Sequence, residues 1–206
     1  MKFKDHRLFA QYLIDTALPP LSPAHACAFR IGNLYPDRNY LTYLRGHTFD
    51  GAARHIGRVC RRLEKKKRWN RYDWFRLGTL MHYLADSFTL AHSPLFRGSL
   101  HDHRAYEFKL HDEFGFFLEH FALGAHDNGM PLHAQLHARQ AAYLNEAPSV
   151  EKDCFYIVST CLLTISRILA GQTETRRRVP EVQKPRRVRR AIRRVLSKIR
   201  RKKQAA

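Results

Sequence analysis

Two histidine–carboxylate pairs are the residues of this sequence best suited to chemistry. His82 and Asp86 are four residues apart, and His103 and Glu107 have the same spacing. On a helix, this spacing places both side chains of a pair on one face. His92 lies between the two pairs, so five possible ligands occur within 26 residues. Because zinc binds imidazole nitrogens and carboxylate oxygens readily, the pattern indicates a metal site between helices.

The same spacing also has a purely structural interpretation. A single histidine–acid pair four residues apart is more often a surface ion pair or a hydrogen-bonded core histidine. The neighbours of both pairs are largely apolar, including Leu84, Phe88 and Leu110. Charged groups among such neighbours need a partner or a metal to offset the loss of hydration. The spacing alone therefore leaves both interpretations open.

The residues around these pairs resemble the signature of a known family, the bacterial zinc-dependent phospholipases C. Residues 82–92 read HYLADSFTLAH, with a His-Tyr dipeptide, an Asp four residues after the His and a second His six residues further on. The family continues to a His-x-x-x-Glu pair, which residues 103–107 match, including the Tyr before the Glu. Upstream, the family's remaining ligand positions are matched in order by His6, Pro36-Asp37 and Gly46-His47.

The resemblance implies a cluster of two zinc ions and a possible third. Carried over residue by residue, the first zinc would be held by Asp37, His47, His82 and Asp86. The second would be held by His92, His103 and Glu107. His6 and Asp86 would hold the third, with Asp86 bridging the first and third sites. In the family, the first amino group of the processed chain completes the third site.

The sequence departs from the family pattern at two points. No removable signal peptide is evident, so Met1 is expected to be retained, leaving the third site weakly occupied or completed by Met1 itself. Leu90-Ala91 stand where a Pro usually precedes the last His of the signature. For the upstream His of the first site, His55 is an alternative to His47.

The resemblance implies zinc-dependent hydrolysis of a phosphodiester, with phospholipid as the favoured substrate. Asp37 is expected to orient or deprotonate the attacking water, or to act only as a ligand. One alternative is a nuclease-like hydrolase, because the fungal single-strand nucleases share this fold and the present chain is basic. The other is a non-catalytic membrane- or nucleic-acid-binding protein that the metal cluster only stabilises.

The elements that must position these residues are predicted to be helices. The hydrophobic periodicity is helical nearly throughout, which predicts an all-α, single-domain bundle with the metal cluster between helices. Residues 20–45 contain Pro, Gly and Asn, so we expect a long loop that carries Asp37. The apolar run 154–170 is interrupted by polar residues and is expected to be a buried core helix rather than a membrane span. Helices are predicted over residues 3–18, 47–66, 72–90, 100–122, 131–145 and 150–170.

Length and charge divide the chain into two parts. The 206 residues are 44% hydrophobic, which suits one folded core and excludes a disordered chain. We assign residues 1–171 to the helical domain and residues 172–206 to a basic tail. The tail has 15 Lys/Arg against two acids, which is +13 of the net charge of +19. The four cysteines form no CxxC pair, so we expect a cytoplasmic protein with reduced thiols.

The basic tail is expected to contact an anionic surface. Val188, Ile192, Leu196 and Ile199 occur at helical spacing among the Lys/Arg residues, which predicts an amphipathic helix over residues 186–203. Such a helix can lie on an anionic membrane, which would place the protein peripherally on the inner membrane surface. Non-specific binding to nucleic-acid phosphates and a solvated, disordered tail are the alternatives.

Overall fold

The computed structural model describes residues 1–39, 48–121, 127 and 129–173. Within these residues the chain forms seven α-helices, one 3-10 helix and no strand, which confirms the predicted all-α fold. Residues 174–206 lie outside the described residues, so the basic helix stays a prediction. The elements are α1 (Phe3–Thr16), α2 (Pro23–Arg38), α4 (Phe49–Glu64), α5 (Arg71–Ser87), η1 (Leu90–His92), α6 (Leu100–His120), α7 (Leu132–Asn145) and α8 (Val150–Thr173).

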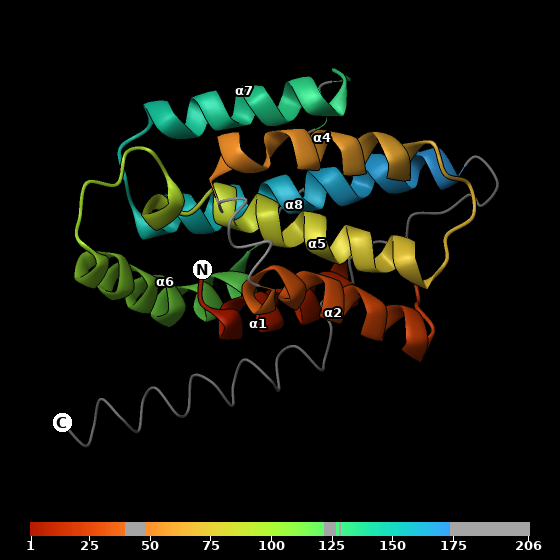
Figure 1. Ribbon diagram of the computed structural model, residues 1–206, viewed down its shortest axis with the longest axis horizontal. Coiled ribbons are helices and arrows are strands. Elements are labelled where there is room, and N and C mark those ends of the chain that lie inside the picture. Colours follow the sequence, from red (N-terminus) through yellow and green to blue (C-terminus); the bar gives the residue numbers. More distant parts are fainter. Residues whose placement is uncertain (40–47, 122–126, 128, 174–206) are drawn as a thin grey trace.

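Helix α5 is the central element of the bundle. In Figure 1 it lies between α1 and α2 on one side and α4 and α8 on the other, and it contacts all four helices. Every residue from Leu77 to Ser87 is buried. A helix that is buried on all sides is normally apolar all round. Because α5 nevertheless carries His82 and Asp86, the neighbouring helices must supply groups that compensate these polar side chains.

Two glycines allow α2 to approach α5 backbone to backbone. A Cβ atom at Gly32 would lie 2.0 Å from the carbonyl oxygen of Phe75, and one at Gly78 would lie 2.1 Å from that of Phe29. Side-chain hydrogen bonds join the same surfaces: the Asn33 amide donates to the Gly78 carbonyl (3.3 Å). The close crossing fixes the last turn of α2, which carries Asp37, beside α5.

The loop expected over residues 20–45 is wrong for its described part, because α2 occupies most of it. Ser22 caps the helix by accepting a hydrogen bond from the amide of His25, and Pro23 occupies the first turn, where proline is tolerated. Pro36 cannot donate to the carbonyl of Gly32, four residues earlier. That carbonyl instead accepts a hydrogen bond from the Thr79 hydroxyl of α5 (3.2 Å).

Two other predicted segments need comment. Helix α5 ends at Ser87 instead of Leu90, and the hydroxyl of Thr89 donates to the carbonyl of Ala85 after the helix ends (3.0 Å). The chain then makes the short helix η1, which ends at His92. Helix α8 is long and apolar enough to cross a membrane, but 67% of its most apolar window is buried inside the bundle. This burial agrees with the expected core helix.

The close crossing of α2 and α5 predicts a large effect of one methyl group. We expect Gly78→Ala to lower the free energy of unfolding by about 3 kcal/mol, because the added Cβ can be accommodated only if the two backbones separate. Gly57→Ala is the matched control, since its Cβ would meet only the end of the Arg61 side chain, 3.3 Å away. Urea denaturation followed by circular dichroism compares the variants. Equal midpoints for the two would contradict the crossing described here.

Candidate metal centre

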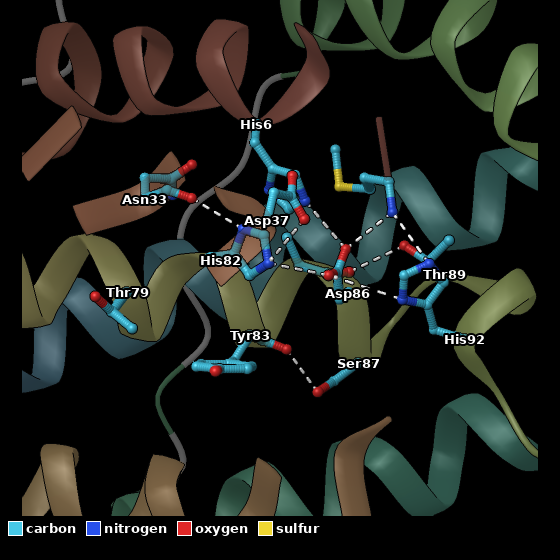
Figure 2. Close-up of polar contacts among 12 residues, drawn as sticks. His6, Asn33, Asp37, Thr79, His82, Tyr83, Asp86, Ser87, Thr89 and His92 are labelled. Carbon is cyan, nitrogen blue, oxygen red and sulfur yellow. Dashed lines mark hydrogen bonds and ion pairs between the residues drawn. The ribbon is translucent and has the colours of Figure 1, made fainter. Parts of the chain in front are cut away.

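The carboxylate of Asp86 is the centre of a buried polar cluster. Its Oδ1 lies 2.9 Å from the Met1 amino nitrogen and 3.1 Å from Nε2 of His6. Its Oδ2 lies 3.2 Å from Nε2 of His82 and 3.7 Å from Nδ1 of His92. Figure 2 shows these side chains converging on Asp86. Burial alone would raise the pKa of Asp86, but the Met1 ammonium and the three histidines hold it well below its usual value.

The predicted ligands form two neighbouring groups of donors. Within each group the donor atoms all lie within 4.8 Å of one another. Five elements supply them: α1, α2, α5, η1 and α6. The structure thus brings together seven of the eight predicted ligands, and the eighth, His47, lies outside the described residues. The first group is His6, Asp37, His82 and Asp86, and the second is His92, His103 and Glu107.

The hydrogen bond of His82 shows what the first group is suited to hold. Nδ1 of His82 lies 2.9 Å from the backbone carbonyl of Asn33, so Nδ1 must be the donor. In the neutral ring, Nε2 then carries a lone pair. This lone pair faces Oδ2 of Asp86 at 3.2 Å and Oδ1 of Asp37 at 3.6 Å. Such atoms repel unless a proton or a metal cation lies among them. A backbone acceptor on the far nitrogen is also the usual support of a metal-bound histidine.

His6 is held in its neutral form. The rings of His6 and His82 are stacked with their centroids 3.9 Å apart, so two imidazolium charges would repel each other. Burial, and then the charge of His82, lower the pKa of His6 to about 3. His6 is therefore neutral at physiological pH, which is the form that binds a metal.

The second group combines the imidazoles of His92 and His103 with the carboxylate of Glu107. Nε2 of His92 and Nε2 of His103 lie 3.5 and 3.6 Å from Oε1 of Glu107. Burial would raise the pKa of Glu107, but the hydrogen bond from His92 and the Met1 ammonium lower it to about 2. Glu107 is therefore ionised near neutral pH. Imidazole and carboxylate at these distances match the mixed donor set of a zinc site.

The Met1 amino group lies between the two groups. Besides Asp86, it approaches Oε1 of Glu107 (3.3 Å) and Nε2 of His92 (3.5 Å). Burial alone would lower the pKa of this amino group, but the carboxylates of Asp86 and Glu107 raise it overall. The Met1 nitrogen thus lies within 3.5 Å of proposed ligand atoms from both groups.

The structure differs from what the sequence predicted at His55 and at Asn33. His55, the alternative to His47, belongs to neither donor group within the described part of the chain. Its ring packs against Tyr83, 5.2 Å away, beside a cavity of about 400 Å³ between α2, α4 and α5. Asn33, which orients His82, was not predicted. It precedes Asp37 by four residues, a spacing that would have indicated a shared helix face if residues 20–45 had been interpreted as a helix.

The buried neutral state of His6 predicts an acid-sensitive fold in chelator-treated protein. Unfolded, this imidazole takes up a proton near pH 6.5, whereas in the fold it does so only near pH 3. Between these values the unfolded state binds more protons, so the free energy of unfolding falls as the pH falls. From pH 7 to pH 5 the loss is about 2 kcal/mol from this group. Urea denaturation at both pH values measures it.

His6→Asn should reduce this pH dependence, even if the variant is less stable at both pH values. His133→Asn is the control, because His133 is an exposed histidine on α7. An unchanged pH dependence in His6→Asn would show that His6 is not neutral in the fold.

The comparison with known proteins agrees with this geometry. A family model described as zinc dependent phospholipase C matches residues 5–161, which run from α1 into α8 and include both donor groups. No curated protein and no solved structure matches the chain. The match covers more than half of the sequence and all of the described ligand side chains. The chain therefore belongs to the zinc-dependent phospholipase C family.

Proposed function

We propose that this protein is a zinc-dependent phosphodiester hydrolase that acts on phospholipid, with its reaction at the Asp86 cluster. The observation that carries the proposal is the convergence of His82 Nε2 on the carboxylates of Asp86 and Asp37, while Nδ1 of the same ring donates to the Asn33 carbonyl. Family membership supports a hydrolase of the phospholipase C type. The geometry supports a metal centre, because His6 is neutral and Glu107 is ionised, which are the forms that bind a metal.

Each donor has a proposed place in the centre. Asp37, His82 and Asp86 would hold one zinc, with His47 as a further ligand. His92, His103 and Glu107 would hold a second. His6, Asp86 and the Met1 amino nitrogen would hold a third once that amino group has released its proton. Bound zinc lowers the pKa of a coordinated water to about 7 and stabilises negative charge on phosphoryl oxygens.

Asp37 is the residue proposed to act on the attacking water. It lies at the end of α2, and its side chain is 24% exposed, whereas those of His82 and Asp86 are 0 and 1% exposed. Its carboxylate can therefore accept a hydrogen bond from a water molecule that enters from solvent, and can take up the proton of that water. The fixed crossing of α2 and α5 holds this carboxylate in place.

The surroundings of the second donor group favour a lipid substrate. Leu95, Leu100 and Phe108 are 40, 68 and 62% exposed, and they lie near His92, His103 and Glu107 in the sequence. Exposed large apolar side chains beside a polar site are suited to contact with acyl chains. Lys2, whose ammonium group lies over the ring of Phe108, adds a positive charge that suits an anionic lipid phosphate.

Two asparagine variants test the proposal. Asp86→Asn should abolish hydrolysis of a short-chain phosphatidylcholine and remove the zinc of the two proposed sites that include Asp86. Asp37→Asn should keep zinc in the second group but lower kcat by about 100-fold or more, because the group that takes the proton is lost. Asp112→Asn, at an exposed acid on α6, is the control and should behave as wild type.

Zinc content and initial rates are measured on the same preparations, with single-stranded DNA as a second substrate. Hydrolysis by Asp86→Asn without bound zinc would refute the metal mechanism. Cleavage of DNA with no cleavage of phosphatidylcholine would refute the lipid substrate.

A further inference from the structure

Asp153, in the first turn of α8, is a buried carboxylate that the proposed reaction does not use. Its residue is 0% exposed, and three groups donate hydrogen bonds to it. The Leu90 amide (2.6 Å) and the Tyr106 hydroxyl (2.8 Å) donate to Oδ2. The Tyr143 hydroxyl (2.8 Å) donates to Oδ1. One carboxylate thus joins η1, α6 and α7 to α8.

Two of the three donors belong to the elements that carry the second donor group. Leu90 is the first residue of η1, and His92 is the last. A three-residue 3-10 helix has few hydrogen bonds of its own, and Thr89 at its N-cap makes no side-chain capping bond. The bond from the Leu90 amide to Asp153 therefore fixes the start of the turn that ends in the His92 ligand.

Tyr106 fixes the rotation of α6 about its own axis. It immediately precedes Glu107 and follows His103 by three residues. Successive residues of an α-helix are about 100° apart, so a rotation that breaks the Tyr106–Asp153 bond would also swing both ligands. The hydrogen bond therefore holds His103 and Glu107 toward η1 and His92.

The carboxylate at this position is costly for the fold. Burial raises the pKa of Asp153 to about 6, although the three hydrogen bonds oppose the rise. An apolar residue of similar size would avoid this cost if packing were the only requirement. A carboxylate at this place is accounted for if it accepts the hydrogen bonds that hold the elements with the proposed metal ligands.

We propose that Asp153 is a positioning residue of the metal centre, which sets the distance between His92 and the His103–Glu107 pair. This inference rests on the proposed function, since it names the support of one of the proposed zinc sites. Asp153 does not touch the reacting atoms. It acts through the backbone of η1 and through the side chain of Tyr106.

The two tyrosines provide a matched pair of variants. Tyr106→Phe and Tyr143→Phe each remove one hydroxyl and one 2.8 Å hydrogen bond to the same carboxylate. Only Tyr106 lies on an element with metal ligands; Tyr143 lies on α7, which carries none of the described ligands. We expect Tyr106→Phe to raise the dissociation constant of the zinc proposed at His92, His103 and Glu107 about tenfold, and Tyr143→Phe to change it less than about twofold.

Competition with a chromophoric chelator measures the zinc affinities, and the absorption spectrum of the cobalt-substituted protein reports ligand geometry. The spectrum should change in Tyr106→Phe and stay as in wild type in Tyr143→Phe. Equal effects of the two substitutions on affinity and spectrum, or no effect of either, would overturn the positioning role. Asp153→Asn should reproduce the effect of Tyr106→Phe.

A readout without metal separates this inference from the proposed function. The imidazole NMR signals of His92 and His103 in the metal-free protein should shift in Tyr106→Phe and not in Tyr143→Phe. Unchanged signals would overturn the inference. If the proposed function is wrong instead, the wild-type protein will bind no zinc or cleave no phosphodiester, while these signals still respond to Tyr106→Phe.

Discussion

The buried negative charge of Asp86 is the constraint on which the rest of this structure depends. A carboxylate removed from water in the middle of a core helix would cost several kcal/mol without compensation. Compensation arrives from three directions: His6 and Met1 at the start of α1, His82 one turn earlier on α5, and His92 on η1. Another packing of the helices would leave the carboxylate of Asp86 buried without these compensating groups. The packing of the fold and the geometry of the site therefore depend on each other.

The close crossing of α2 and α5 also orients a proposed metal ligand, His82. Gly32 and Gly78 let the two backbones touch, and the Thr79 hydroxyl satisfies the carbonyl that Pro36 leaves without a donor. The same contact brings the Asn33 carbonyl to Nδ1 of His82. That bond sets the tautomer of His82 and turns the lone pair of its Nε2 toward Asp37 and Asp86. The proposed metal binding thus depends on Gly32 and Gly78, because only glycine permits the close crossing.

Helical spacing could predict only part of the site, and the resemblance to the family pattern supplied His6, Asp37 and the division of the ligands into sites. Helical geometry alone predicted that the two side chains of each pair, His82/Asp86 and His103/Glu107, share a helix face. Helix α2 was missed because Pro, Gly and Asn indicate loops locally, whereas here Pro23 lies in the first turn and Gly32 at a helix crossing. Tertiary packing against α5 thus outweighed the local preference of these residues for a loop.

The supporting residues could not be predicted, because their roles depend on contacts between distant parts of the chain. Asn33 and His82 are separated by 49 positions, and Asp153 and Leu90 by 63. No local pattern encodes such contacts. His47 lies in a part of the chain that the structure does not describe, so its place in the first site stays a prediction.

The central claim is that the Asp86 cluster is a zinc centre of nitrogen and oxygen ligands. Elemental analysis combined with zinc-edge X-ray absorption, on protein purified without chelators, tests it most directly. We expect about two or more zinc ions per chain, with nitrogen and oxygen neighbours at about 2.0–2.2 Å and no sulfur neighbour. Protein with far less than one metal ion per chain, or zinc bound to cysteine sulfur, would contradict it.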